Sequence, residues 1–145
     1  MNQTITAIKG IRVGHATSEA GMTGCTVILC PPNTVGGVDQ RGGAPGTRET
    51  DLLRPLHMVE QVHAIALSGG SAYGLSVADG VMRYCEENNI GYPVPPFVVP
   101  IVPTAILMDL YMGDPTIRPN ADMGYQASVS ATADPVTSGN IGAGM

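Results

Sequence analysis

The sequence predicts a single α/β domain, and three observations support that prediction. The chain has 145 residues, which is close to the commonest size of one globular domain. Hydrophobic residues make up 43% of it and charged residues 13%, about half the usual charged share, which excludes a disordered chain. Apolar β-branched runs alternate with segments of helical periodicity, as expected for buried strands and amphipathic helices. We therefore expect residues 1–145 to fold as one domain.

Strands are expected mainly in the first half of the chain. Residues 5–8 and 11–13 flank a Lys-Gly pair and predict a short hairpin. Residues 25–30 form an apolar run rich in β-branched side chains, which predicts a strand buried on both faces. Residues 35–39 are its expected partner strand after a proline-containing turn. Residues 42–46, which are mostly glycine, are expected to form a loop.

Helices are expected from residue 50 onward. Residues 51–59 repeat apolar side chains at helical spacing after a Thr-Asp cap, and residues 72–85 do so after a glycine-rich turn. Between them, residues 62–67 predict a second buried strand. Small residues after a Pro-Asn pair predict a third helix over residues 121–131. Residues 92–103 are punctuated by prolines and are expected to be extended, with room for one short strand at residues 97–99 or 101–102.

Composition also excludes several classes of function. Twelve acidic and seven basic residues give a formal charge of −5, and no basic stretch is present, so no nucleic-acid partner is expected. The N-terminus lacks the apolar core of a signal peptide, and the longest apolar run is too short and too rich in proline to span a bilayer. These features predict a soluble, cytoplasmic protein with no membrane partner. The three cysteines have no metal-ligand spacing and are expected to be reduced thiols.

A glycine-rich turn follows the second buried strand. Gly69, Gly70 and Ser71 lie at a strand-to-helix junction, where backbone N–H groups and the helix start can bind an oxyanion, a carboxylate or a phosphate. The alternative is a tight turn in which Ser71 is only the helix cap. Ser71 is not assigned as a hydrolase nucleophile, because Tyr73 occupies the last glycine position of a G-x-S-x-G elbow and all three histidines precede it.

Two further segments contain candidate side chains. Arg41 and Arg48 lie in a charged glycine loop, where they could orient a substrate carboxylate, although ion pairs that pin the loop are the favoured interpretation. Asn140 lies among glycines, so its amide could donate to a developing oxyanion; the alternative is an ordinary turn or a disordered end. The histidines lack the spacing of a zinc site and the aspartates form no calcium loop, so no metal or organic cofactor is expected.

Six blocks of sequence also occur together in one order. They are RVGH (residues 12–15), TGCTV (23–27), RGGAPGTRETDLL (41–53), LSGGSAYGL (67–75), PIVP (100–103) and GNIGAG (139–144). Together they resemble the L-aminopeptidase/D-esterase (DmpA) family, whose relatives include β-peptidyl aminopeptidases and nylon-oligomer hydrolases. The resemblance runs through nearly the whole chain, and its two longest blocks are specific.

The resemblance implies an α-β-β-α four-layer sandwich and a self-processing hydrolase of the N-terminal-nucleophile type. Members are made as one precursor that cleaves itself before a Ser or Thr, and that residue then hydrolyses amides. By this resemblance the chain is most of the non-nucleophilic α-subunit, and Met145 is a cut point in a longer chain. The nucleophile then belongs to a β-subunit from the same precursor, which is the expected partner.

The resemblance also assigns roles to residues. Tyr73 matches the active-site tyrosine that orients the nucleophile or substrate, and Asn140 matches the oxyanion-stabilising asparagine. Gly69, Gly70 and Ser71 are expected to contact the substrate, a short peptide, amino-acid amide or ester with a free amino terminus. The resemblance implies no cofactor and implies assembly as a homo-oligomer. Two alternatives stay open: a small-molecule or anion-binding module without catalysis, and a catalytically inert interaction fragment.

Overall fold

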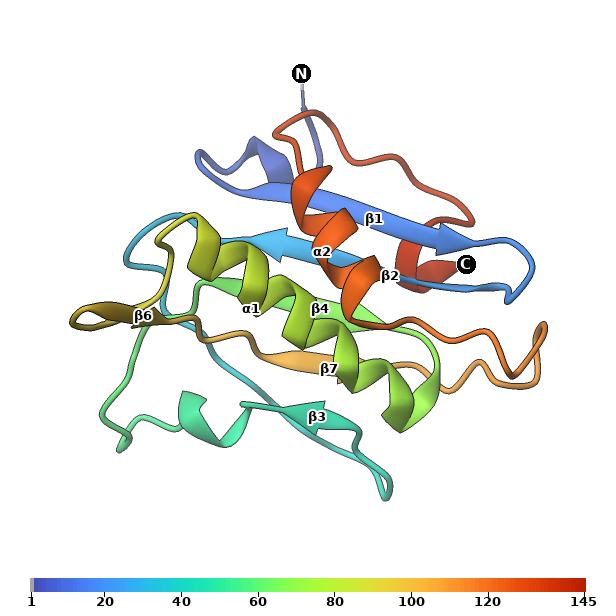
Figure 1. Cartoon of the computed structure of the whole chain (residues 1–145), viewed down its shortest axis with the longest axis horizontal. Helices are drawn as coiled ribbons and strands as arrows, with labels where there is room; N and C mark the ends of the chain where they lie inside the picture. Colours follow the sequence, from blue (N-terminus) through green and yellow to red (C-terminus); the bar gives the residue numbers. More distant parts are fainter. Residues whose placement is uncertain (1) are drawn as a thin grey trace.

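The computed structural model describes residues 2–145, and a five-stranded mixed sheet forms its centre (Figure 1). Neighbouring strands are antiparallel, except that β4 and β7 are parallel. In spatial order the strands are β1 (Arg12–Ser18), β2 (Thr23–Leu29), β4 (Ala64–Ser68), β7 (Thr104–Ile106) and β3 (Thr47–Arg48). A separate antiparallel hairpin is formed by β5 (Tyr92–Val94) and β6 (Phe97–Val99).

The two faces of the sheet have different surroundings. In β2, Cys25, Val27 and Leu29 are at most 2% exposed, whereas the residues between them are half-buried. Because successive side chains of a strand point to opposite faces, one face of the sheet is covered and the other is partly open. The register places one row of residues across this second face, which we call the open face: His15, Thr26, Leu67, Ala105 and Thr47.

Two helices, α1 (Val77–Glu87) and α2 (Ala121–Val129), cover the first face of the sheet (Figure 1). They meet at Gly80 and Gly124, where an added Cβ would overlap a backbone carbonyl oxygen of the opposite helix. Glycine at both positions therefore lets the two backbones touch. The core between helices and sheet is built from small and medium side chains: Val27, Ala64, Ala66, Val77, Ala78, Val81, Cys85, Val102 and Ala127. This arrangement is of the mixed α/β class that the sequence predicts.

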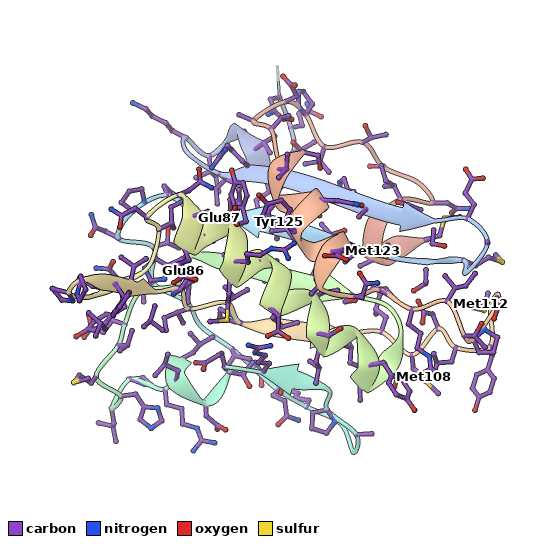
Figure 2. All side chains as sticks on the ribbon, viewed as in Figure 1. Glu86, Glu87, Met108, Met112, Met123 and Tyr125 are labelled. Atoms are coloured by element: carbon purple, nitrogen blue, oxygen red, sulfur yellow. The ribbon has the colours of Figure 1, made fainter. Side chains whose placement is uncertain are left out.

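The helices are also joined by polar contacts at their outer side. The Tyr125 hydroxyl donates to Glu87 Oε2 at 2.7 Å, and Figure 2 shows these two side chains where α2 approaches the end of α1. The Tyr125 ring meets the Tyr84 ring edge to face, with 6.0 Å between centroids. At the start of α2, the Asn120 side chain accepts the N–H of Met123 at 3.1 Å, which caps the helix.

The open face is covered only in part. The short 3₁₀ turn η4 (Gly142–Gly144) lies against β2, with further contacts to β1 and β4. Residues 2–145 thus supply one sheet and one helical layer, and the other two layers of the expected four-layer sandwich are not among them. No helix formed by these residues has the length and apolarity needed to cross a membrane.

Most predicted elements are confirmed, but the predicted helix at residues 51–59 is wrong. Only the 3₁₀ turn η2 (Asp51–Leu53) forms there. Arg54 leaves the helical conformation at φ −70° and ψ 138°, because the ring of the following Pro55 disfavours a helical backbone at the residue before it. The apolar side chains beyond that point do not reach the core, and Leu56 is 97% exposed.

Two predicted strands are also wrong. Residues 5–8 form the 3₁₀ turn η1 (Ile5–Ala7), and the hairpin partner of β1 is β2 instead. Residues 35–39 form no strand and contribute one isolated bridge, between Val35 and Gln61. In both segments apolar side chains point to solvent, since Ile8 is 60% and Val35 is 69% exposed.

Candidate active site

The glycine-rich turn after β4 begins the candidate site. Gly70 has φ 81°, which only glycine adopts without strain, and the 3₁₀ helix η3 (Ser71–Ser76) starts directly after it. The N–H of Gly69 donates to Gly24 O at 2.9 Å, that of Gly70 to Asp109 Oδ1 at 2.7 Å, and that of Ser71 to Leu107 O at 3.0 Å. All three donors are thus used within the chain, and an anion at this turn would compete with a carboxylate already there.

Asp109 is a residue of the site that the sequence analysis missed. Its Oδ2 accepts the hydroxyl of Thr23 at 2.6 Å, while Oδ1 accepts the N–H of Gly70. The carboxylate therefore ties the turn to the start of β2 and fixes the direction in which η3 leaves the sheet. The only signal in the sequence was an isolated acid within an apolar stretch of a charge-poor chain.

Tyr73 projects from η3 and is 60% exposed. The guanidinium carbon of Arg118 lies 3.7 Å from the centroid of its ring, a cation–π contact. Arg118 is held in turn by its Nε, which donates to Pro115 O at 2.7 Å. The tyrosine ring is therefore oriented from one side, while its remaining surface is open to a substrate or to another part of the protein.

The segment that contains Asn140 lies on the open face. Two residues beyond Asn140, the N–H of Gly142 donates to Thr17 Oγ1 at 2.8 Å, and the N–H of Ala143 donates to Thr26 Oγ1 at 3.1 Å. These bonds anchor the glycine-rich loop to β1 and β2. Asn140 itself is exposed, so its amide is accessible to a group approaching over the open face.

An apolar hollow of about 320 Å³ lies between these two segments. Its walls come from β2, β4, β7 and the glycine-rich end of the chain: Thr26, Leu67, Ala105, Ile106, Leu107, Ala143 and Gly144. Leu107 also accepts the N–H of Ser71, so the hollow adjoins the turn that leads to Tyr73. Neither Tyr73 nor Asn140 lines it directly. The hollow therefore adjoins the chain segments that carry the two candidates, while both side chains lie outside its lining.

The loop that leads from β7 to α2 passes close to this region. Leu107, Met108, Tyr111 and Met112 expose more than half of their side-chain surface, and Figure 2 labels the two methionines on this loop. Within the same loop the N–H of Met112 donates to Asp109 O at 2.9 Å. Asp109 thus holds an apolar loop and the glycine turn against one another.

The arginines of the charged glycine loop make ion pairs. Arg41 Nη2 lies 2.8 Å from Asp39 Oδ2 at the surface. Arg48 Nη1 lies 2.6 Å from Asp79 Oδ1, which ties β3 to α1, and its other terminal nitrogen lies 3.2 Å from Met82 Sδ. These contacts agree with the interpretation that the charges pin a long loop.

The thiols and one histidine have structural surroundings. Burial raises the pKa of Cys25 to about 12 and that of Cys85 to about 11, so neither forms the thiolate that a nucleophile requires. His63 Nδ1 accepts the N–H of Ile101 at 3.1 Å, and burial lowers its pKa. Within the part of the chain that the structure describes, no three His, Cys, Asp or Glu side chains gather as a metal site.

Comparison with known proteins also indicates a peptidase. The profile of Peptidase family S58 matches residues 3–145. An uncharacterised aminopeptidase of Mycobacterium bovis is 53% identical over 149 residues, covering 97% of this chain and 43% of that protein. A 6-aminohexanoate-oligomer endohydrolase of a Kocuria species is 32% identical over 136 residues, covering 94% of this chain and 36% of that protein.

A solved structure extends the comparison to the fold. A β-aminopeptidase of a Burkholderia species superposes with a TM-score of 0.74 at 21% identity, covering 99% of this chain and 42% of the other. At that identity the likeness shows a shared fold. The chain thus spans less than half the length of the curated relatives it matches. From the match over residues 3–145 and the 53% identity, the chain belongs to peptidase family S58.

Proposed function

We propose that this chain is most of the non-nucleophilic α-subunit of a DmpA-type aminopeptidase or amidase, which removes N-terminal residues from short peptides, amino-acid amides or esters. Family membership and the names of the relatives support a hydrolase of this kind. The observation on which the proposal depends is the loop with Asn140, which is anchored to the open face beside an apolar hollow and the turn to Tyr73.

The attacking hydroxyl, in this proposal, belongs to a Ser or Thr beyond Met145. Self-cleavage of a longer precursor would expose that residue at the N-terminus of a β-subunit, which would bring a second sheet onto the open face and complete the sandwich. The partly exposed Leu67 and the length of the relatives support this assembly. We further propose that the complete enzyme is a cytoplasmic homo-oligomer that needs no metal or organic cofactor.

The proposal gives each candidate side chain a role, which follows from the family resemblance. The hydroxyl of the nucleophile adds to the substrate carbonyl carbon, and its proton passes to the α-amino group of the same residue. The Asn140 amide donates to the oxygen that becomes negatively charged. Tyr73, whose ring Arg118 orients, directs the nucleophile or the substrate. Collapse of the intermediate breaks the C–N bond, and the departing amine takes the proton held by the α-amino group. Water then adds to the acyl-enzyme, which releases the acid and restores the hydroxyl.

The experiment expresses the full-length protein and measures self-cleavage and amide hydrolysis together. We expect two bands on a denaturing gel, the smaller one beginning with Ser or Thr, and release of p-nitroaniline from amino-acid p-nitroanilides. Asn140→Ala is expected to lower kcat by about 10² to 10³, the usual effect of removing one oxyanion donor. Tyr73→Phe is expected to lower turnover as well, whereas Tyr111→Phe, at a side chain that is 86% exposed, serves as the matched control.

The alternatives predict other outcomes. A single uncleaved band with a small anion bound at the turn of Gly69, Gly70 and Ser71 would favour the binding module. The three N–H groups of that turn are already paired within the chain, so the geometry does not favour it. A single band with neither ligand nor turnover would favour an inert interaction fragment. Unchanged turnover in both the Asn140 and the Tyr73 variants would remove the site assignment.

A further inference from the structure

His15 and Thr26 form a hydrogen-bonded polar pair on the open face. They are register partners in β1 and β2, and His15 Nδ1 lies 2.9 Å from Thr26 Oγ1. The residues beside them point the other way: Cys25 is fully buried in the core, and an added Cβ on Gly14 would overlap Ala127 O of α2. The pair thus spans the edge strand β1 and its neighbour β2.

The glycine-rich loop rests directly on this pair. Thr26 Oγ1 accepts the N–H of Ala143, and the N–H of Gly142 is bound by Thr17, also in β1. Gly142 has φ 62°, and an added Cβ there would overlap Thr26 Oγ1 and come close to His15 Nδ1. The backbone of the loop therefore lies in contact with both side chains, two to three residues after Asn140.

The hydrogen-bond inventory of Thr26 shows how a neutral His15 can complete this arrangement. A threonine hydroxyl has one hydrogen to donate and two lone pairs that accept. Because one lone pair is used by Ala143, the hydroxyl hydrogen is free to donate to Nδ1 of a neutral imidazole that carries its proton on Nε2. An imidazolium would instead donate its Nδ1–H to the second lone pair of Thr26 Oγ1, so the hydroxyl hydrogen would lose His15 as its acceptor and would have to turn away.

We propose that His15, in its neutral form, and Thr26 are positioning residues that hold the loop of Asn140 in its active conformation. The proposal rests on the proposed function, since the loop matters only if Asn140 acts in the reaction. Neither residue touches the reacting atoms; both act through the backbone of Gly142 and Ala143.

The surroundings of His15 favour the neutral form. Burial lowers its pKa below 6.5, so the imidazole is mainly uncharged at neutral pH. The groups that face it from β2 and from the glycine-rich loop are uncharged. Among the described residues lining the hollow beside it, Asp134 is the one other titratable side chain. As the pH falls through the lowered pKa, His15 is protonated and the arrangement is expected to loosen.

The test measures the loop and the reaction separately in the full-length protein. Hydrogen–deuterium exchange with mass spectrometry follows peptides of residues 139–145, and kcat and KM are measured on an amino-acid p-nitroanilide. Thr26→Val keeps the shape of the side chain and removes the hydroxyl, whereas Thr26→Ser keeps the hydroxyl. Thr34→Val removes a hydroxyl that donates to Pro31 O, away from the loop, and is the matched control.

We expect Thr26→Val to raise exchange in residues 139–145 and to lower kcat at least about fivefold, the equivalent of one hydrogen bond of about 1 kcal/mol. KM should change little, and the strand peptides of β1 and β2 should stay protected. Thr26→Ser should resemble the wild type, as should the Thr34→Val control. His15→Leu should behave like Thr26→Val, while His15→Asn, which keeps an acceptor near the place of Nδ1, should retain activity.

The pH dependence distinguishes positioning from mere support of the fold. After correction for the intrinsic exchange rate, the wild-type loop should lose protection and kcat should fall as the pH is lowered below 6.5, and His15→Asn should show neither change. An identical pH profile in His15→Asn would overturn the neutral-histidine role. Unchanged exchange in Thr26→Val, or raised exchange with unchanged kcat, would overturn the positioning role. A wild-type protein that hydrolyses no amide would instead refute the proposed function, and exchange would still decide whether the pair holds the loop.

Discussion

Asp109 is the residue whose removal should show how firmly the glycine turn is held. Its carboxylate accepts two hydrogen bonds, from Thr23 and from the backbone of Gly70, at 2.6 and 2.7 Å. Because hydrogen bonds to a charged group are worth about 1.5–3 kcal/mol each, we expect Asp109→Ala to lower the free energy of unfolding by about 2 kcal/mol after partial replacement by water. Urea denaturation followed by circular dichroism measures this.

The control for this change is Asp109→Asn. The amide oxygen can still accept the N–H of Gly70 and the amide nitrogen can donate to the Thr23 hydroxyl, so the loss should be clearly smaller than for alanine. Equal losses in the two variants would mean that the turn requires the negative charge of the carboxylate, and that hydrogen bonds to an amide of the same size do not replace it.

At the scale of elements, the contact of α1 with α2 depends on the absence of a side chain at Gly80. An added Cβ would overlap Ala121 O and would lie 2.7 Å from Tyr125 N, both backbone atoms of α2. Alanine favours a helix by about 1 kcal/mol over glycine, but separating the two helices costs about 1–3 kcal/mol. We therefore expect Gly80→Ala to have a lower midpoint in urea than the wild type.

Gly43→Ala is the matched control, because no atom lies within 4 Å of the Cβ that it would add. Its urea midpoint should be close to that of the wild type. A Gly80→Ala protein that is as stable as this control would show that the helices can separate at little cost, and would contradict the close contact.

The elements that the sequence predicts well are those whose apolar pattern is satisfied by burial. The runs that became β2 and β4 face the core, and the spacing of α1 matches its buried side, which includes Val81 and Cys85. The helix predicted at residues 51–59 failed because Pro55 acts on Arg54 locally, whatever the apolar spacing suggests. Apolar periodicity in the sequence thus predicts a helix or strand correctly only where the apolar side of that element is buried against the core.

The candidate site was predictable to a smaller extent. Tyr73 came from a family resemblance, Asn140 came from its glycine-rich surroundings as well as from that resemblance, and both remain predictions. Asp109, His15 and Thr26 were not predicted, because their partners are distant in sequence: Thr23 and Asp109 are 86 residues apart, and Thr26 and Ala143 are 117 apart. A single sequence gives no signal for contacts of that range, which depend on the topology of the whole sheet.

At the scale of the whole molecule, the open face leads to a prediction that compares the 145-residue chain with the full-length protein. Leu67 lies in the middle of the row across this face and is 39% exposed in the 145-residue chain. If a second sheet covers the face in the full-length protein, Leu67 becomes a core residue there. Leu67→Ala should then cost about 2–5 kcal/mol in the full-length protein, the usual range for a buried leucine, and much less in the 145-residue chain.

Thermal and urea unfolding of both lengths, each with and without the substitution, measures this difference directly. Val129→Ala is the control, because its side chain is 59% exposed and extends from α2, on the other side of the sheet from the row that includes Leu67. Its effect should be small and similar at both lengths. A Leu67 substitution that costs the same at both lengths would mean that nothing covers the open face, and the proposed assembly with a second subunit would lose its structural basis.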